Sequence, residues 1–458
     1  MPKVYSARWV LPITSPAINN GAVVVDDPII VAVGSRADIL ADFPEASHED
    51  FGNAAIIPGL INAHSHLELT VMRGFLESEE QDFFAWLWKL TTARLQMTDE
   101  DLFVSAACGA VEAARAGITC LGDASSLAAH SLRALAEVGL RAIVYQESFG
   151  PDPSLAAEAV GKLRLQLDSI RPLQTDLLTA GVSPHSPYTV SAPQLERISR
   201  LAIDENLPVM MHAAESRAEQ QLLDDGSGPF AYGLKLRGIA WQPPGTSSAR
   251  YLHDHGVLNT KPLLAHCVNV DDDDLQLIKN AGAGIAHCPK SNAKLRHGRA
   301  PFARFVTQGL NVGLGSDSVA SNNVCDILEE ARFANLLARS GPDFGLSSEA
   351  GHPQTEVCAT DTLYAATFGG ARAMGLDHIV GALQTRMAAD LTIVRLDGAH
   401  QQPVRDPHDA LVFCSSGKDV VLTVVGGREV YRRGQITTVD EESLRGKLED
   451  TRRKLDDD

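Results

Sequence analysis

The hydrophobic positions of this chain gather into short, nearly continuous apolar runs separated by longer stretches with a helical period. A run of this kind is typical of a strand that is buried on both faces, as in a parallel sheet covered by helices. Eight such runs are Ile56–Ala63, Gly117–Leu121, Arg141–Tyr145, Leu177–Val182, Leu207–Met211, Pro262–Ala265, Gly282–Ala286 and Leu310–Leu314.

Most intervals between these runs contain a segment in which apolar residues recur with the 3.6-residue period of a helix. These segments are Leu102–Ala116, Ser154–Leu167, Ala192–Glu205, Glu215–Asp224, Asp273–Ala281 and Pro301–Gln308. Repeated alternation of strand and helix predicts an α/β fold, and eight alternations predict a closed (β/α)8 barrel of the TIM type. A doubly wound open sheet is the alternative, but no G-x-G-x-x-G motif follows the first strand to support it.

Both ends of the chain are rich in short candidate strands. Strands are predicted at Gly21–Val25, Ile29–Val33, Ala389–Val394, Val420–Val425 and Arg428–Tyr431, with turn residues between them. We therefore expect a small β-sandwich domain built from residues 1–57 and 381–458, and a barrel catalytic domain over residues 58–380.

Composition narrows the class of protein. The chain has 458 residues, of which 44% are hydrophobic and 21% charged, as in an ordinary globular protein. The net charge of -18 disfavours a nucleic-acid partner, and no apolar run is long enough to span a membrane. Seven scattered cysteines without C-x-x-C spacing favour a reducing compartment. We expect a cytoplasmic protein.

Polar residues with metal-binding chemistry follow five of the eight predicted strands. In a barrel of this type, catalytic residues lie at the carboxyl ends of the strands. His64 and His66 are two positions apart, so in a strand both side chains point the same way. The other strand-end residues are His185, His212, His266 and Asp317.

Four of these residues suffice for one cation. Three neutral imidazoles from His64, His66 and His212, with the Asp317 carboxylate, suit Zn²⁺ best, with Fe²⁺ or Mn²⁺ as alternatives. A position left open for water would allow the metal to lower that water's pKa toward about 7. Glu215, three residues beyond His212, is placed to act on the substrate as a proton shuttle.

The strand-end segments also resemble a known family. Pro58–His66 resembles the first-strand motif of the amidohydrolase superfamily. Four further segments resemble its chlorohydrolase and deaminase branch, which includes the adenosylhomocysteine, guanine and s-triazine hydrolases. These segments are His212–Glu215, His266–Asn269, His287–Leu295 and Gly315–Asn323. The resemblance covers nearly the whole chain.

The resemblance implies a role for each residue. His64, His66, His212 and Asp317 would bind one metal ion, and Glu215 and His266 would handle the proton and the water. Asp317 would also accept a proton from the activated water. Two-metal relatives carry a carboxylated lysine at the end of strand four, where this chain has Ser183-Pro184-His185. One metal is therefore expected, and analogy with the family implies a homodimer.

Within the branch, Trp241–Ser247, Pro184–Ser191 and Phe83–Leu87 are similar to the aminodeoxyfutalosine deaminases of menaquinone synthesis. The resemblance implies hydrolytic deamination of a small heterocyclic substrate, an adenine-type nucleoside, with aminodeoxyfutalosine giving futalosine and ammonia as first candidate. The adenosylhomocysteine deaminases usually carry a ribose-binding glutamate after a Trp-Leu pair like Trp86-Leu87. Residues 88–98 contain no acidic side chain, which disfavours that substrate.

Other substrates stay open: S-adenosylhomocysteine or methylthioadenosine, guanine, cytosine, or an s-triazine whose chloro or amino group is hydrolysed. A cyclic-amide hydrolase is disfavoured by the missing lysine, and a non-catalytic scaffold by the complete ligand set. Substrate contacts are expected from His185, Glu68, Trp86, Ser318 and Asn322. Glu68 has a second interpretation as support for the metal site, and Trp86 has one as plain packing.

Overall fold

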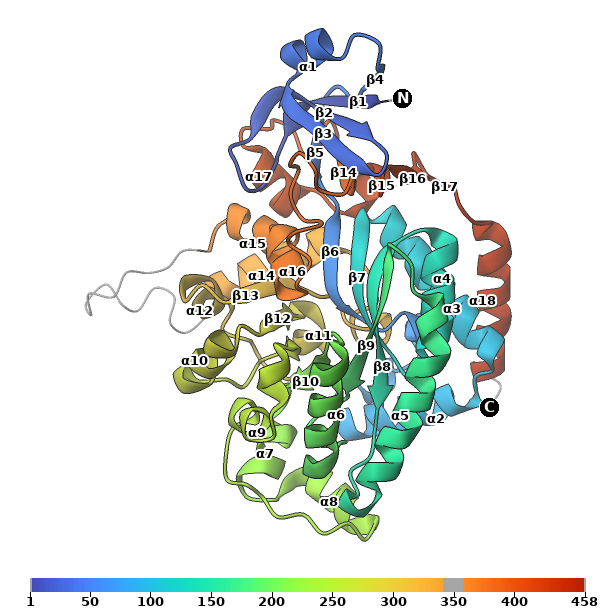
Figure 1. Cartoon of the computed structure of the whole chain (residues 1–458), viewed down its shortest axis with the longest axis vertical. Helices are drawn as coiled ribbons and strands as arrows, with labels where there is room; N and C mark the ends of the chain where they lie inside the picture. The colour runs from blue at the N-terminus through green and yellow to red at the C-terminus, as the bar shows by residue number, and fades with distance from the viewer. Residues whose placement is uncertain (1, 341–356, 457–458) are drawn as a thin grey trace, which may run out of the picture.

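The central domain of the computed structural model is a barrel of eight parallel strands (Figure 1). The structure describes residues 2–340 and 357–456. The barrel strands are β6 (Leu60–Ser65), β7 (Ile118–Ser125), β8 (Arg141–Ser148), β9 (Leu178–Pro184), β10 (Met210–Ala213), β11 (Leu263–His266), β12 (Gly284–His287) and β13 (Asn311–Leu314). Each of the eight predicted runs contains one of these strands or overlaps it.

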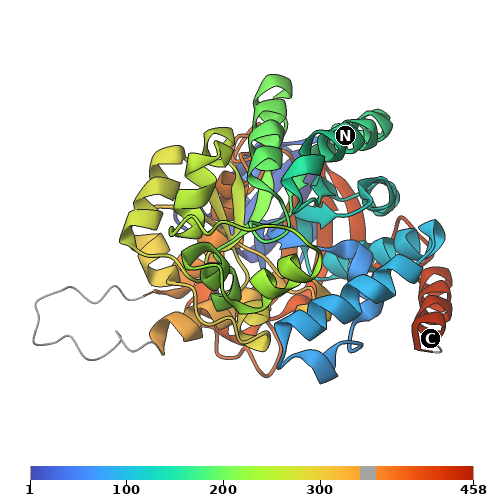
Figure 2. The same ribbon diagram turned by 90° about the horizontal axis from the view of Figure 1, so that it is seen from below.

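The barrel closes through two weak seams. The strands form two hydrogen-bonded halves, β6-β7-β8-β9 and β10-β11-β12-β13. Single parallel bridges, Val182 to Val209 and Ser65 to Asp317, join the halves on either side. Helices surround the strands when the molecule is seen from below (Figure 2). The predicted (β/α)8 barrel is therefore confirmed.

Side chains alternate between the barrel interior and the helical layer, as the pleat of a strand requires. On β8, Ile143 and Tyr145 pack inside with Cys120 and Met210 of other strands. Their neighbours Ala142 and Val144 belong to the core between strands and helices. Odd-numbered residues of β8 therefore face the interior, which places later residues of that strand toward the mouth of the barrel.

Each of the six predicted helical segments corresponds to a helix of the structure, with ends shifted by a few residues, and the other helices were not predicted. Two of the six predicted helices begin with a capping box, in which Thr98 and Asp271 pair with the third residue of their helices and satisfy free backbone N–H groups. The helices are α2 (Phe83–Gln96), α3 (Asp99–Arg115), α4 (Ala128–Val138), α5 (Ala156–Ile170), α6 (Ala192–Glu205), α7 (Arg217–Asp224), α8 (Gly228–Leu236), α9 (Ser248–Asp254), α10 (Asp272–Ala281), α11 (Pro289–Lys294), α12 (Phe302–Thr307), α13 (Val319–Asn322), α14 (Ile327–Arg339), α15 (Ala359–Ala365), α16 (Phe368–Ala373), α17 (Pro407–Asp409) and α18 (Glu441–Asp456). Within residues 2–340 and 357–456, we find no helix with the length and apolar character that a membrane span needs.

The two chain ends build one nine-stranded sheet beside the barrel. Its order is β17-β16-β15-β14-β5-β1-β2-β3, with β4 paired to β1. A buried ion pair from Arg141 at the start of β8 to Asp390 joins the sheet to the barrel. Besides the short helix α1 (Arg36–Asp42), the elements are β1 (Lys3–Val10), β2 (Ile18–Asp26), β3 (Ile29–Ser35), β4 (Ser47–Asp50), β5 (Ala54–Pro58), β14 (Leu391–Arg395), β15 (Val420–Val425), β16 (Arg428–Arg432) and β17 (Gln435–Ile436).

The first predicted strand, Ile56–Ala63, is in fact two strands. It divides at Gly59, between β5 of the nine-stranded sheet and β6 of the barrel. Ile56 lies in the core of the small domain and Ile61 in the barrel interior. Both halves are fully buried, so the hydrophobic pattern alone shows no break.

Gly59 is required at this junction by close packing. A Cβ atom placed on it would lie 1.9 Å from Oγ1 of the buried Thr119. We expect Gly59→Ala to lower the free energy of unfolding by about 1–3 kcal/mol because the core must expand. Gly161→Ala is the matched control: Gly161 is an exposed residue of α5 with open space around it. That change should raise the free energy of unfolding by about 0.5–1 kcal/mol. Urea denaturation of both variants checks the pair, and equal effects would contradict it.

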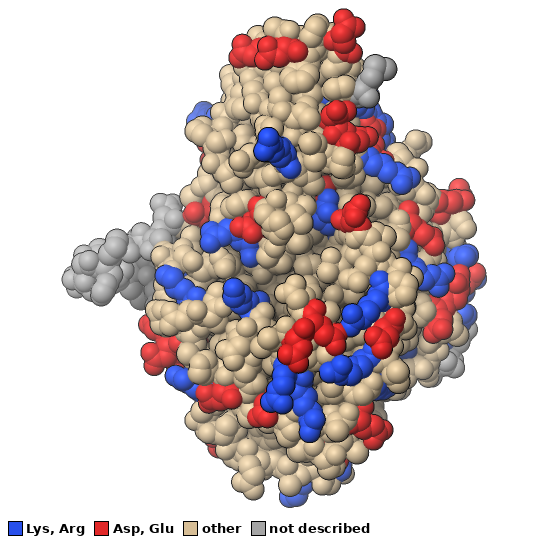
Figure 3. All heavy atoms as spheres, viewed as in Figure 1, with Lys and Arg blue, Asp and Glu red and all other residues tan. Residues whose placement is uncertain are grey.

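Charged side chains of both signs are interspersed on the surface despite the excess of acidic residues (Figure 3). Many form ion pairs, such as Arg304 with Asp272 and Arg36 with Asp50. The face in Figure 3 shows no broad basic area of the kind that binds a phosphate backbone.

Candidate active site

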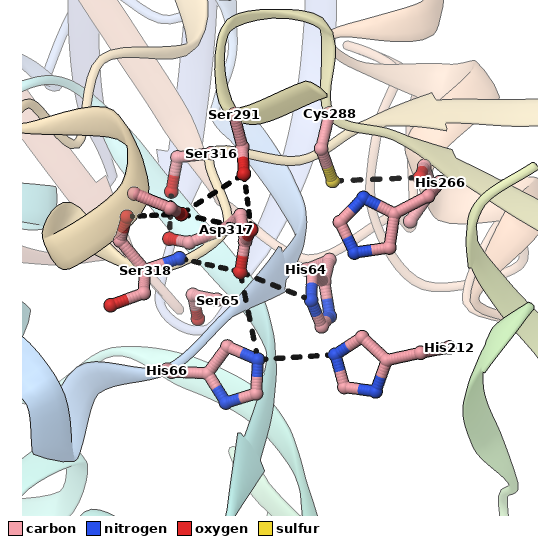
Figure 4. A network of polar contacts seen from close by, with 12 residues as sticks. His64, Ser65, His66, His212, His266, Cys288, Ser291, Ser316, Asp317 and Ser318 are labelled. Carbon is pink, nitrogen blue, oxygen red and sulfur yellow. Dashed lines mark hydrogen bonds and ion pairs between the residues drawn. The ribbon is translucent and has the colours of Figure 1, made fainter. Parts of the chain in front are cut away.

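A cluster of histidines and one aspartate lies at the carboxyl ends of the barrel strands (Figure 4). His64 and His66 come from the end of β6, His212 from β10, His266 from β11, and Asp317 follows β13. Residues separated by more than 250 positions therefore meet because parallel strands of a closed barrel all end on one face.

Four predicted ligands converge on one point. The Nε2 atoms of His66 and His212 are 3.3 Å apart. Asp317 Oδ1 lies 3.4 Å from His64 Nε2 and 3.6 Å from His66 Nε2. His64 Nε2 is buried and has no hydrogen-bond partner in the structure. A buried nitrogen without a partner is costly, and a cation bound between these atoms would remove that cost.

The protonation states of the cluster suit a cation. Burial, followed by the nearby His64, lowers the pKa of His66 to about 4, and burial also holds the pKa of His212 well below its usual value. Burial would raise the pKa of Asp317, but His64 and the other imidazoles hold it well below the usual range. At neutral pH the imidazoles of His66 and His212 are therefore neutral and Asp317 is a carboxylate, which are the forms that bind a divalent metal.

Backbone contacts fix the orientation of these ligands. His212 Nδ1 lies 2.9 Å from the His185 carbonyl oxygen, so it donates its proton there and leaves the Nε2 lone pair toward His66. Asp317 N donates to the His64 carbonyl oxygen over 2.9 Å, across the seam between β13 and β6. Second-sphere contacts of this kind hold metal ligands in place.

Strained backbone gathers at the same strand ends. Ala214, His266, Cys267 and Asp317 all have positive φ, between 47° and 75°, although none is glycine. This left-handed conformation costs free energy and clusters at functional sites, where the surrounding structure holds it in place. At Asp317 it turns the carboxylate back toward His64 and His66.

The other carboxylate oxygen of Asp317 is held by hydroxyl groups. Ser291 Oγ donates to Oδ2 over 2.5 Å and Ser321 Oγ over 3.0 Å, while the Ser318 backbone N–H donates to Oδ1 over 2.7 Å. Hydrogen bonds therefore fix both oxygens of the carboxylate, and such positioning is what a group that transfers a proton to or from one particular atom needs.

Glu215 lies beside the histidine cluster with polar partners of its own. Tyr188 Oη donates to Oε2 over 3.1 Å. Oε1 is 3.4 Å from His297 Nε2 and 3.7 Å from His266 Nε2. Burial would raise the pKa of Glu215, but His266 and His297 lower it to about 2, so the resting group is ionised.

His266 is fixed by a side chain from the following strand end. Its Nδ1 is 2.8 Å from Asn292 Oδ1 and so carries the proton. In the neutral ring Nε2 is then an acceptor, and this buried atom has no hydrogen-bond partner among the described residues. The His266 ring centroid lies 5.5 Å from those of His64 and His212. His266 can therefore accept a hydrogen bond from a water molecule held in the cluster.

Of the predicted substrate contacts, His185 lies at the edge of the cluster and Trp86 lies in α2. The His185 ring centroid is 4.6 Å from that of His212, and its Nδ1 contacts the hydroxyls of Ser186 and Thr189. Trp86 is buried in α2, where its ring stacks with Phe83 at a centroid distance of 6.0 Å. Packing with Phe83 accounts for the position of the ring, while the indole Nε1 is buried without a hydrogen-bond partner among the described residues.

The other three predicted contacts are used inside the protein. The Glu68 carboxylate accepts hydrogen bonds from Ser125 Oγ and from Ser126. Ser318 Oγ caps α13 by accepting from the backbone N–H of Ala320. The Asn322 amide donates to the Ser316 carbonyl oxygen and to Glu330. These hydrogen bonds are all made within the protein, and contact of the three residues with a substrate stays a prediction.

Several site residues carried no role in the sequence-based prediction. Tyr188 and His297 contact Glu215, Asn292 contacts His266, and Met210 Sδ lies 3.2 Å from His64 Nδ1. Tyr188 and Asn292 fall inside segments that resemble the family, so a signal for them existed. His297 lies in an irregular loop, where no periodic pattern marks it.

Comparison with known proteins agrees with this geometry. A family model described as "Amidohydrolase family" matches residues 55–430. The 5-methylthioadenosine/S-adenosylhomocysteine deaminase of Nitratidesulfovibrio vulgaris is 30% identical, over 95% of this chain and 93% of that protein.

Solved structures show the same fold. The adenosine deaminase from Xanthomonas campestris with bound zinc has a TM-score of 0.84 at 24% identity, and covers 99% of this chain and 98% of its own. The Helicobacter pylori aminofutalosine deaminase, in complex with methylthio-coformycin, has a TM-score of 0.76 at 22% identity, and covers 93% of this chain and 100% of its own. From the matched family model, the full-length relative and the strand-end cluster, we conclude that this chain belongs to the amidohydrolase family.

Proposed function

We propose that this protein is a hydrolytic deaminase that uses one divalent metal to release ammonia from an adenine-type nucleoside. One observation carries the proposal. An ionised carboxylate, Glu215, lies beside the cluster of predicted metal ligands, and His266 is close to both, with its Nε2 3.7 Å from Glu215 Oε1 and its ring centroid 5.5 Å from that of His64. Hydrolysis of an aromatic amidine needs this pair of functions, activation of water and delivery of a proton to the ring.

His64, His66, His212 and Asp317 would hold the metal, for which Zn²⁺ is the first candidate because three imidazoles and a carboxylate are a common zinc donor set. When bound, such a metal lowers the pKa of a coordinated water and supplies a nucleophile at neutral pH. The remaining steps depend on the side chains around it.

Glu215 would carry the first proton. It rests as a carboxylate, so it takes a proton from the attacking water and passes it to the ring nitrogen next to the carbon under attack. Tyr188 and His297 hold it in place during this transfer. Protonation of the ring prevents negative charge from building on that nitrogen.

Asp317 would carry the second proton. Its carboxylate, held by Ser291 and Ser321, takes the other proton of the water and gives it to the departing amino group. His266 Nε2 orients the water. The carbon–oxygen bond forms, the carbon–nitrogen bond breaks, and ammonia leaves with both protons of the water accounted for.

Two substrates compete within this class. Aminodeoxyfutalosine is the first candidate, because the segments around Phe83, Pro184 and Trp241 resemble its deaminases and residues 88–98 lack an acidic side chain. 5-Methylthioadenosine and S-adenosylhomocysteine are the second, supported by the 30% identity to a deaminase named for them.

An ammonia-release assay tests the proposal. Purified protein loaded with zinc should be supplied with aminodeoxyfutalosine, 5-methylthioadenosine, S-adenosylhomocysteine, adenosine, guanine, cytosine and a chloro-s-triazine, with chloride release measured as well for the triazine. We expect ammonia from at least one adenine nucleoside. Activity toward guanine, cytosine or the triazine alone would refute the nucleoside class while leaving the hydrolase chemistry intact.

A further inference from the structure

Glu147 is a buried carboxyl group at the mouth of the barrel to which the proposed chemistry gives no role. It follows Ile143 and Tyr145 in the interior-facing row of β8 and lies one position before the end of that strand. Its backbone neighbour in register is Ser183 on β9. The side chain is 6% exposed, so it borders the open interior.

The Glu147 carboxyl lacks the partners that a buried polar group normally has. Its Oε1 is buried and makes no hydrogen bond, and the same is true of Ser183 Oγ beside it. His185 Nε2 is 4.0 Å away, too far for a direct hydrogen bond. Burial first, and then the charges of Glu68 and Asp123, raise the pKa of Glu147 to about 8. Such a group is costly unless a ligand completes it.

A second cation is a poor match for this place, although Glu147, His185 and His212 lie close enough together to suggest one. Both nitrogens of His212 are already engaged, Nδ1 by the His185 carbonyl oxygen and Nε2 by the cluster with His66. The Nδ1 of His185 contacts two hydroxyl groups. Only Glu147 and one His185 nitrogen are left, fewer ligands than a protein metal site uses.

We propose that Glu147, together with His185 Nε2, binds a hydroxyl group of the substrate's sugar. A hydroxyl both donates and accepts, so one placed between these atoms can donate to the carboxyl oxygen and accept from the imidazole. A carboxyl group has two oxygens and can take the hydroxyls of a vicinal diol together. This inference rests on the proposed function, because only a nucleoside brings such a diol to the site.

The location of the pair agrees with this role. The His185 ring centroid is 4.6 Å from that of His212, so the pair lies beside the predicted metal ligands rather than among them. A heterocycle attacked at the cluster would extend its sugar over this part of the wall. Residues 88–98, which follow Trp86-Leu87, contain no acidic side chain, whereas Glu147 at the end of β8 is a buried carboxyl group whose Oε1 has no hydrogen-bond partner among the described residues.

Substrate pairs that differ only in the diol test the inference. We would measure kcat/KM for the adenine nucleoside that reacts fastest and for its 2',3'-dideoxy form, in the wild-type protein and in Glu147→Gln. The wild type should prefer the diol by about 10- to 100-fold, the effect of hydrogen bonds to an ionisable group. Glu147→Gln should lose that preference, with its kcat/KM for the dideoxy form within about threefold of wild type.

The controls separate recognition from structure. Glu196→Gln, a surface change on α6, should preserve the preference for the diol. Bound metal should stay at one ion per chain in Glu147→Gln. Equal losses with both nucleosides, absence of preference in the wild type, or two metal ions that fall to one in the variant would each overturn the inference. Failure of the proposed function would look different, because the wild type would then release no ammonia from any adenine nucleoside.

Discussion

Asp317→Asn is expected to leave the fold intact and to lower kcat by about 10²- to 10⁴-fold, the range for loss of a general base. The carboxylate lies within 3.6 Å of both His64 and His66 and is held at the other oxygen by Ser291. An amide has nearly the same shape but takes up no proton, so the second proton of the attacking water would have no acceptor.

The fold should survive because the surrounding groups adapt. The hydroxyls of Ser291 and Ser321 can rotate and accept hydrogen bonds from the new amide. Circular dichroism and thermal unfolding check this, and metal analysis separates lost base from lost metal. Asp397→Asn, at a side chain that is 60% exposed in the small domain, is the matched control and should react at the wild-type rate. Normal turnover by Asp317→Asn would rule out the proposed base.

His64→Ala is expected to lower bound metal from about one ion per chain to below about 0.1 after dialysis, since even supporting contacts of a metal site change affinity 10- to 100-fold. His64 Nε2 is buried and has no hydrogen-bond partner among the described residues, so no hydrogen bond competes with a metal for this atom. Loss of this ligand also leaves a cavity, which should lower the melting temperature modestly.

Elemental analysis of the dialysed protein gives the metal content directly. His253→Ala removes an imidazole from an exposed position on α9 and should retain the wild-type metal content. Unchanged metal in His64→Ala would remove this residue from the ligand set. A drop in both variants would point to a general effect on folding or purification.

Much of the architecture could be predicted from the sequence because barrel strands and helices have strong periodic signals. The end points were less accurate: the predicted Ile56–Ala63 strand divides at Gly59, since both halves are buried in different cores. Hydrophobicity reports burial but not which core a residue enters. In the small domain, the strands near both chain ends could be predicted from the sequence. Their pairing could not, because β5 pairs with β14 through contacts between residues more than 300 positions apart.

The candidate site divides in a similar way. The grouping of His64, His66, His212 and Asp317 could be predicted, because every parallel strand of a barrel delivers its last residues to one face. The hydrogen-bond partners of Glu68, Ser318 and Asn322 could not be predicted, since a polar side chain near a strand end can turn toward the cavity or toward the protein. Here their hydrogen bonds lead to Ser125, Ala320 and Glu330.

The sequence by itself determined which chemical groups lie at the mouth of the barrel, because the strand period and the strand order fix which residues stand at the end of each strand. Only the tertiary structure decided their states. The His185 carbonyl oxygen sets the proton on His212, His297 and Tyr188 hold Glu215, and Glu147 is left buried without a partner. These properties depend on distances of about 3 Å between residues far apart in the chain, and hydrogen bonding and desolvation change steeply over such distances.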